Sequence, residues 1–222
     1  PVNWDGEAVK VLEQMDDYTD SINSFVINTE SYNDASIGAG LVVSNAFHST
    51  VSVNRPHSLH SVTHTGTQMN EIYLHKGTLT VYTDEQKFFT RAKVPEKLHE
   101  GLVFALEEFD VETPMFDLLV LNSLEHLVDQ EADVIYVNGD SSIRGVDCHH
   151  ILISGPHSDL QIWVEKGDKP TPKRTLMTYK GNEYLPRHEV FIDWVETDGF
   201  KKPLFEFTPP KGSQEIDFID TP

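Results

Sequence analysis

The stretch "YLHKGTLTVYTDEQKFFTRA", residues 73–92, decides the fold class. It holds short runs of β-branched and aromatic residues, which turn-type residues at "HKG" and "DEQ" separate from one another. Strands that are joined by such short turns are antiparallel neighbours. The stretch therefore predicts a meander of antiparallel strands.

The same strand signal continues on both sides of the meander. Upstream, "SFVINTESY" (24–32) and "GLVVSNAFHSTVSVN" (40–54) are predicted strands. Strands return from residue 133, in the order "DVIYVNG", "VDCHHILIS", "LQIWVEKG", "RTLMTYKG", "EVFIDWVE" and "LFEFTP". We expect about ten or eleven strands in one large, curved antiparallel sheet.

Helical periodicity appears in far fewer places than the strand signal. Segments 5–19 and 95–109 repeat apolar residues at helical spacing, and "TPMFDLLVL" (113–121) predicts a third helix that Thr113 caps. The shared-face residues are Ala8, Leu12, Met15 and Ile22 in the first segment, and Leu98, Leu102, Ala105 and Phe109 in the second. Because the helices do not alternate with the strands, the fold class is α+β, with helices covering the sheet. We expect a single domain over residues 1–222.

Charge and composition exclude several classes of function. The chain carries 36 acidic against 17 basic residues, a formal net charge of −19, which disfavours nucleic acids and anionic lipids as partners. The segment 96–147 alone holds thirteen acidic residues and two basic ones, which is either a solvated face or a docking surface for a basic partner. We find no transmembrane segment. The start "PVNWDGEAV" has no apolar leader, so we expect a mature form from which an export signal peptide is absent.

The single cysteine lies beside two histidines in "VDCHHILIS" (146–154). In a strand, Cys148 and His150 point to one face and His149 to the other, so the three side chains cannot converge on one metal ion. The favoured interpretation is a packed strand, in which Cys148 acts as a small apolar residue. A metal-dependent hydrolase that uses Cys148 and His150 stays the less favoured alternative.

Other catalytic signals are weak. His60 and His64 share a strand face but lie too far apart for one ion, and the sequence has no glycine-rich phosphate loop, no G-x-S-x-G and no H-E-x-x-H motif. We therefore predict no enzyme activity, no catalytic residue, no metal and no cofactor.

Apolar strips along the later strands have two interpretations. In "LQIWVEKG", Leu160, Ile162 and Val164 share the face that looks buried, and Trp163 belongs to the other face. Further strips pair Met177 with Tyr179 and Phe205 with Phe207. Such strips are either plain core or the wall of a cavity for an apolar ligand.

These residues carry a resemblance to a known family. "VNGDSSIRGVDCHHILI" (137–153), "DLQIWVEKGDKPTPKRTLMTYK" (159–180) and "FIDWVETDGFKKPLFEFTPPKGSQEIDFI" (191–219) resemble predicted periplasmic proteins of bacteria, domain of unknown function family 2092. The family motifs are G-x-S-T-V-D-G-V-x-C-H-H, W-I-E-x-G-D-x-P-x-P-x-K and D-W…L-F-x-F-x-P-P. One departure is Arg144, where the family usually has Asp; Gly145, which permits a positive φ, is kept.

The resemblance implies a fold and a location. The family is similar in fold to the LolA, LolB and LppX lipoprotein-carrier group, which has a half-open, strongly curved antiparallel sheet, a half-barrel, closed by helices around an apolar cavity. It implies a periplasmic protein, with outer-membrane association as a further expectation. No catalytic role comes with the "CHH" signature.

The leading hypothesis is a carrier that binds a hydrophobic ligand, a lipid or the acyl chain of a lipoprotein, between the sheet and the helices. The expected wall consists of Ile162, Val164, Met177, Tyr179, Phe205 and Phe207, with Leu102 and Phe109 from the helical lid. The alternative from another class is an envelope interaction module that docks a protein partner through its acidic face.

Overall fold

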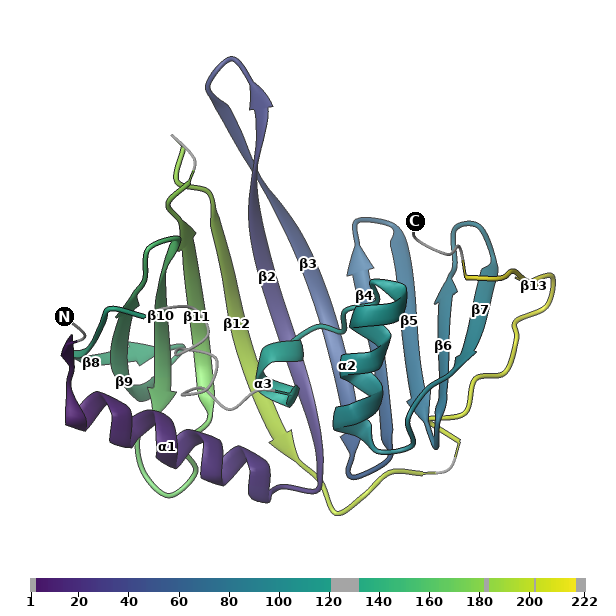
Figure 1. The fold of residues 1–222 in the computed structure, drawn as a ribbon, viewed down its shortest axis with the longest axis horizontal. Helices are drawn as coiled ribbons and strands as arrows, with labels where there is room; N and C mark the ends of the chain where they lie inside the picture. The colour runs from purple at the N-terminus through teal and green to yellow at the C-terminus, as the bar shows by residue number, and fades with distance from the viewer. Residues whose placement is uncertain (1–2, 121–131, 182–183, 202, 219–222) are drawn as a thin grey trace. The chain divides into compact units, whose positions relative to one another are not determined.

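The computed structural model describes residues 3–120, 132–181, 184–201 and 203–218, and it shows an open, mostly antiparallel sheet with three helices (Figure 1). The described strands are β1 (Asn3–Trp4), β2 (Ser24–Gly38), β3 (Leu41–Asn54), β4 (Ser58–Thr65), β5 (Gln68–His75), β6 (Thr78–Thr83), β7 (Phe88–Lys93), β8 (Val134–Ile143), β9 (Val146–Ser154), β10 (Ser158–Glu165), β11 (Pro172–Tyr179), β12 (Arg187–Glu196) and β13 (Gln214–Glu215). Their order in the sheet is β1-β8-β9-β10-β11-β12-β2-β3-β4-β5-β6-β7-β13. The short end strands β1 and β13 pair in parallel with β8 and β7.

The helices are α1 (Gly6–Ser21), α2 (Leu98–Phe109) and α3 (Phe116–Val120). Helix α1 begins after Asp5, whose carboxylate accepts a hydrogen bond of 2.9 Å from the backbone N–H of Glu7, as an N-cap does. Among the helices of the described residues, none has the length and the apolar character that a bilayer crossing requires.

The expected fold class is confirmed, and most expected elements are found. The meander of residues 73–92 forms β5, β6 and β7, and β9 has the expected bounds Val146–Ser154. The structure adds β1, β4 and β13, which were not predicted as strands. In β4 the alternation is hidden, because Ser58, Leu59, His60 and Ser61 are all buried whichever face they belong to.

Two element boundaries and one strand were predicted wrongly. "LFEFTP" forms no strand; turns occupy residues 203–206. Pro203, Pro209 and Pro210 lack the N–H that a strand donates to its ladder, which explains the absence. Helix α2 begins at Leu98 instead of Pro95, and α3 begins at Phe116, while the hydroxyl of Thr113, the predicted cap, is buried without a hydrogen-bond partner among the described residues. The last residue of the expected 113–121 helix lies outside the described residues.

The chain divides into two compact units. Unit 1 comprises Pro1–Ile22, Thr29–Phe47 and Leu121–Trp194, and unit 2 comprises Asn23–Asn28, His48–Val120 and Val195–Pro222. Strands β2, β3 and β12 contribute residues to both units. In unit 1, helix α1 packs against β8 and β10; in unit 2, helix α2 packs against β5 and α3. The expectation of one domain over 1–222 stays a prediction.

A glycine sets how closely α2 packs on its strand. A Cβ atom at Gly101 would lie 3.0 Å from Leu74 Cδ1 and 2.9 Å from the carbonyl oxygen of Pro95. Both Leu74 and Leu102 are buried at this contact, so the small residue at position 101 allows the helix to approach β5. The periodicity of the sequence identified Leu102 but not the role of Gly101.

Candidate functional site

The sheet of unit 1 has two faces of different character, because successive side chains of a strand point to opposite sides. Strand β9 shows the division. Ile151 and Ile153 point to one side, which we call the apolar face, and Cys148 and His150 point to the other.

The strand register aligns the apolar face into rungs that cross β8 to β12. One rung consists of Ile135, Ile153, Leu160, Met177 and His188, and the next consists of Val137, Ile151, Ile162, Thr175 and Val190. Side chains that are directly opposite in such pairs are in contact. Along the first rung, Ile135 is fully buried, whereas Met177 and His188 are only half-buried. This rung therefore becomes more accessible toward β12, whereas on the next rung Val137 of β8 is half-buried and Val190 of β12 is buried.

Helix α1 covers the β8–β10 end of the apolar face. Its inner side chains Leu12 and Met15 are almost completely buried, and the helix contacts β8 and β10. The opposite side of these strands carries His150 and Gln161, which a helix with an apolar stripe cannot match. The helix and the apolar rungs therefore form one hydrophobic layer.

The structure places the four predicted wall residues of unit 1 on this apolar face. Ile162 and Val164 of β10 are buried, and Met177 of β11 is half-buried. Tyr179 shares the face by strand parity but lies at the end of β11, where its side chain is 45% exposed. Whether any of them touches a ligand stays a prediction.

His188 is the polar end of an otherwise apolar rung, and no pattern in the sequence identifies it as part of the site. Its sequence neighbours Arg187 and Glu189 point to the other face, where they pair with Asp34 and Arg174. Burial holds the pKa of His188 below the ordinary value of 6.5, so the imidazole is neutral at pH 7. Within the described part of the chain, its ring makes no hydrogen bond.

In unit 2, the predicted lid residues lie on α2. Leu102 is buried where the helix packs on β5. Phe109 is half-buried at the end of the helix, and its ring stacks on that of Phe218 with 4.4 Å between the ring centroids. The C-terminal segment thus contacts the end of the predicted lid.

Phe207 packs on the sheet of unit 2, but not beside α2. Its ring centroid lies 5.4 Å from that of Tyr73, 5.6 Å from Tyr82 and 5.2 Å from Phe89. Tyr73 and Leu74 are successive residues of β5, so they point to opposite faces, and Leu74 is the one that meets α2. The structure therefore brings Phe207 to the sheet face that lies away from Leu102.

Phe205 lies in the same segment as Phe207. Its ring is nearly parallel to that of His75, with 6.3 Å between the centroids. Tyr73 and His75 share one face of β5, so Phe205 and Phe207 pack on the same side, as the sequence predicted, although not as parts of a strand. Their part in ligand binding stays a prediction.

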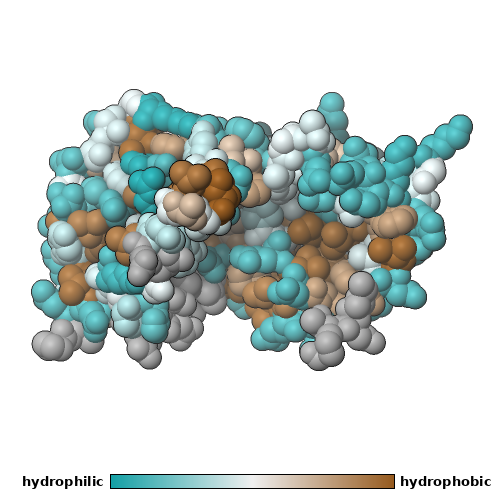
Figure 2. All heavy atoms as spheres, turned by 90° about the horizontal axis from the view of Figure 1, so that it is seen from above, coloured by the Kyte–Doolittle hydropathy of each residue, from teal (hydrophilic) through white to brown (hydrophobic). Residues whose placement is uncertain are grey.

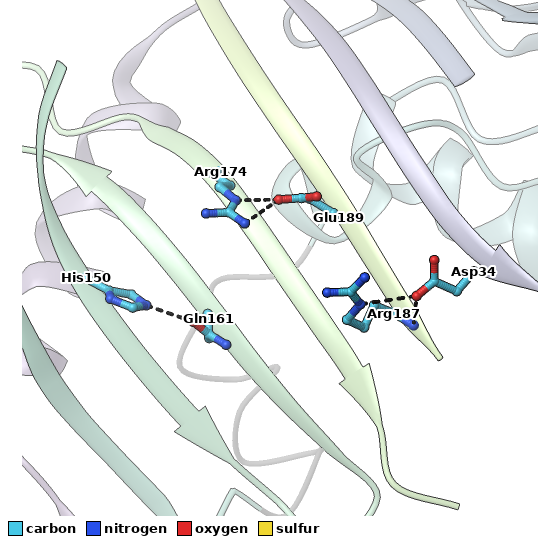
Figure 3. A network of polar contacts seen from close by, with 6 residues as sticks. All are labelled: Asp34, His150, Gln161, Arg174, Arg187 and Glu189. Carbon is cyan, nitrogen blue, oxygen red and sulfur yellow. Dashed lines mark hydrogen bonds and ion pairs between the residues drawn. The ribbon is translucent and has the colours of Figure 1, made fainter. Parts of the chain in front are cut away.

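The second face of unit 1 carries a continuous stack of rings and a guanidinium, and we call it the stacked face. His150, Trp163, Arg174 and Phe191 lie directly opposite one another on β9, β10, β11 and β12. The His150 and Trp163 rings stack with centroids 4.2 Å apart, and the Arg174 guanidinium lies 4.3 Å from the Trp163 ring. Figure 3 shows the polar contacts around this stack, in which Arg174 pairs with Glu189 and His150 bonds to Gln161.

The "CHH" signature has a structural explanation on the stacked face. Cys148 is fully buried in a cluster with Ile143 and Trp163, and burial raises the pKa of its thiol. A nucleophilic cysteine needs the opposite shift. The His150 ring bonds through Nε2 to Gln161 and through Nδ1 to Asn138, so both ring nitrogens are occupied. This packing favours the structural interpretation over the hydrolase alternative.

A second histidine cluster lies in unit 2. His60 Nε2 is 2.8 Å from a carboxylate oxygen of Glu71, and the Tyr73 hydroxyl donates to the same oxygen. These bonds lower the pKa of Glu71, while burial and the neighbouring carboxylate raise that of Tyr73. His57 contacts the carbonyl of Glu96 instead. The histidines of this region therefore do not converge, and the described residues hold no group suited to bind a metal ion.

Three solved structures have the same overall fold as this chain. Lipoprotein LppX from Mycobacterium tuberculosis aligns with a TM-score of 0.54 at 11% identity, covering 88% of this chain and 98% of that one. LprF from Mycobacterium bovis aligns with a TM-score of 0.52 at 11% identity, covering 95% and 99%. An uncharacterized conserved protein from Thermus thermophilus aligns with a TM-score of 0.52 at 8% identity, covering 95% and 99%. At these identities the likeness shows the fold alone. A search of curated proteins found no match.

The chain belongs to the family described as "Predicted periplasmic protein (DUF2092)", whose sequence profile matches residues 8–219. The match covers nearly the whole chain, including the apolar face, the stacked face, α2 and all of α1 after its first two residues. The resemblance that the motifs after residue 137 indicated is confirmed.

Proposed function

We propose that this member of the predicted periplasmic family binds a hydrophobic ligand, an acyl lipid or the acyl chain of a lipoprotein, on the apolar face of unit 1, and that it acts as a carrier. The observation that supports this most is the gradient along the rung from Ile135 to His188. This rung opens at Met177 and His188, where an elongated apolar group can continue the packing.

The energetics suit reversible binding. Each methylene that moves from water onto the strip gains about 0.8 kcal/mol, so a chain of about ten methylenes gains roughly 8 kcal/mol. Association costs about 4–15 kcal/mol of lost freedom, which offsets much of this gain. At the low end of that cost the net gain is about 4 kcal/mol, a dissociation constant of about 1 mM, so tighter binding requires a longer chain or an added polar contact.

His188 supplies the polar contact in this proposal. A neutral imidazole donates one N–H, and the ring has no partner among the described residues. An ester or amide carbonyl at the head of an acyl chain is a suitable acceptor, because burial of a carboxylate there would add a desolvation penalty. The ligand would lie with its chain toward Leu160 and its carbonyl at His188.

In unit 2, Leu102 and Phe109 stay predicted lid residues and Phe205 and Phe207 stay predicted contacts, although Phe207 packs on the sheet face away from Leu102. They are not part of the site that is proposed in unit 1. Phe109 is half-buried and is held by the stack on Phe218. Phe205 and Phe207 are held by the aromatic cluster around Tyr73. Their contribution is tested by the same binding measurement, with Phe109→Ala, Phe205→Ala and Phe207→Ala as variants.

The test combines native mass spectrometry of the freshly purified protein with titration of a fluorescent acyl probe, a dansyl-labelled fatty acid methyl ester. We expect a co-purified lipid, and we expect Met177→Gln to weaken probe binding at least tenfold. Met177→Leu keeps an apolar side chain and should bind normally.

Thr178→Gln is the matched control, because residue 178 points to the stacked face of the same strand. Equal probe affinity for Met177→Gln and Thr178→Gln, or no lipid in repeated preparations together with no probe binding, would contradict the proposal. The acidic-face docking hypothesis and the less favoured hydrolase alternative would then remain.

A further inference from the structure

The β2–β3 hairpin continues past the strands that flank it (Figure 1). Pairing of β3 with β4 begins at His48, and β12 begins at Arg187, whose backbone N–H binds the carboxylate of Asp34. Residues 35–47 therefore form a two-stranded ribbon, and no strand of the described residues pairs with either of its outer edges. A ribbon of this kind gains little stability from its own contacts.

The end of this ribbon, which we call the tip and define as Ile37–Val42, is apolar and exposed. Ile37 is 62% exposed, Leu41 is 60% exposed and Val42 is 43% exposed. The run 35–47 contains no charged residue and no histidine, although 24% of the chain is charged. Figure 2 views the molecule from above, the side on which the hairpin ends, and shows a compact hydrophobic patch (brown) among hydrophilic residues (teal).

The turn of the tip also avoids polar side chains. Gly38, Ala39 and Gly40 all have positive φ, at 93°, 50° and 75°. Asn and Asp are the residues that usually join Gly in such a turn, because they tolerate the left-handed region and bond their own backbone. Ala39 accepts that conformation without offering a polar group, so the whole end of the hairpin is uncharged and apolar.

We propose that the tip inserts into the headgroup region of a lipid bilayer with zwitterionic lipids, and that it brings the protein to the membrane surface for a short time. A net charge of −19 repels anionic lipids, which restricts the surface to uncharged or zwitterionic headgroups. The ribbon edges carry unpaired backbone groups, which restricts insertion to the outer layer, where water still reaches them.

Three partly exposed apolar side chains give weak attachment. A single myristoyl chain alone gives a membrane binding constant of about 10⁴ M⁻¹, and the tip offers less apolar surface than that chain. Attachment of this strength is brief. The inference goes beyond the proposed ligand binding, because the tip lies outside the rungs of the apolar face.

Flotation of the full chain with vesicles tests the proposal. We expect the protein to float with vesicles of phosphatidylcholine, and the double variant Ile37→Ser, Leu41→Ser to float at least fivefold less. Adding about 30% phosphatidylglycerol should reduce flotation of the original protein. The double variant Val195→Ser, Ile216→Ser is the matched control, because these side chains are 45% and 41% exposed elsewhere in the chain.

No flotation of the original protein, or equal flotation of the tip variant and the control, would overturn membrane insertion. Concentration-dependent dimerisation in analytical ultracentrifugation that the tip variant abolishes would assign the tip to a second copy of the chain instead. Binding of the acyl probe in solution should be the same in the tip variant, so a failure here is separate from a failure of the proposed function.

Discussion

The two faces of the unit 1 sheet are built from the same strands in different ways. On the apolar face, rungs of Ile, Leu and Met side chains pack through non-directional contacts, as along Ile153, Leu160 and Met177. On the stacked face, His150, Trp163, Arg174 and Phe191 meet with defined ring geometry, and hydrogen bonds fix their polar atoms. A contact of the apolar face can therefore be replaced by another apolar contact, whereas the contacts of the stacked face depend on the particular residues that form them.

This difference indicates a division of labour. A surface that holds its own side chains through stacking and paired charges is already satisfied, whereas an apolar strip that is only half-buried at Met177 and His188 still gains from a further contact. The proposed function therefore gives ligand binding to the apolar face and leaves the stacked face a role in stability.

The largest expected effect concerns Trp163. Trp163→Ala should lower the free energy of unfolding by about 3–5 kcal/mol, because it removes a buried ring that contacts His150, Arg174 and the Cys148 cluster. Met177→Ala should cost under about 2 kcal/mol, since its side chain is half-buried. Urea unfolding monitored by circular dichroism measures both values.

Ligand binding should rank the same two variants in the reverse order. At a temperature where both are folded, Met177→Ala should weaken binding of the acyl probe, and Trp163→Ala should leave it within twofold of the original. If Trp163→Ala weakens the probe as much as Met177→Ala does, the two faces do not have separate roles.

The sequence predicted the apolar face better than the stacked face, for a physical reason. Alternation in "LQIWVEKG" is visible in one strand alone, so Ile162 and Val164 were assigned to one face without any knowledge of their neighbours. The stack depends on register among four strands, which places Arg174 opposite both Trp163 and Phe191. No local pattern contains that register, so Trp163 was assigned a face but no partners.

His188 and Phe207 were missed or misplaced for similar reasons. His188 lies between two charged residues, and its position on the apolar face follows only from its pairing with Met177. Phe207 follows an apolar alternation, but the prolines around it prevent a strand, and its contacts come from Tyr73, Tyr82 and Phe89 far away in the sequence. Contacts between residues so far apart in the sequence produce no local pattern in the spacing of apolar residues.

A smaller effect is expected on the pH dependence of stability, which should differ between His188 on the apolar face and His150 on the stacked face. Burial lowers the pKa of His188 and of His150 below 6.5, and Arg174 adds to the shift at His150. The stability that neutral histidine contributes is therefore present above the unfolded pKa of about 6.5 and is lost as the pH falls through the folded pKa. His188→Met should flatten this acid limb, by less than about 1.4 kcal/mol because the side chain is only partly buried.

His150→Met is the contrasting variant. It should lower stability at pH 7.5 as well as at pH 5, because Gln161 and Asn138 lose their hydrogen-bond partner. Urea unfolding at both pH values distinguishes the two patterns. A His188→Met variant that is destabilised equally at pH 7.5 and pH 5 would mean that His188 has a partner which holds it in place.

The smallest expected effect concerns Arg144, which lies at the exposed edge of the stacked face. Its guanidinium pairs with Glu30 and lies 4.4 Å from the Phe191 ring. A double-mutant cycle with Arg144→Ala and Glu30→Ala should give a coupling of about 0.2–1 kcal/mol that falls in 1 M NaCl, because Arg144 is 60% exposed. The positive φ of Arg144 (49°) does not affect the double-mutant cycle, since an Ala at this position has the same backbone strain. The salt-resistant remainder of the Arg144→Ala effect would measure the contact with Phe191. A coupling above about 2 kcal/mol that persists in salt would mean that ion pairs, and not stacked rings, hold this face together.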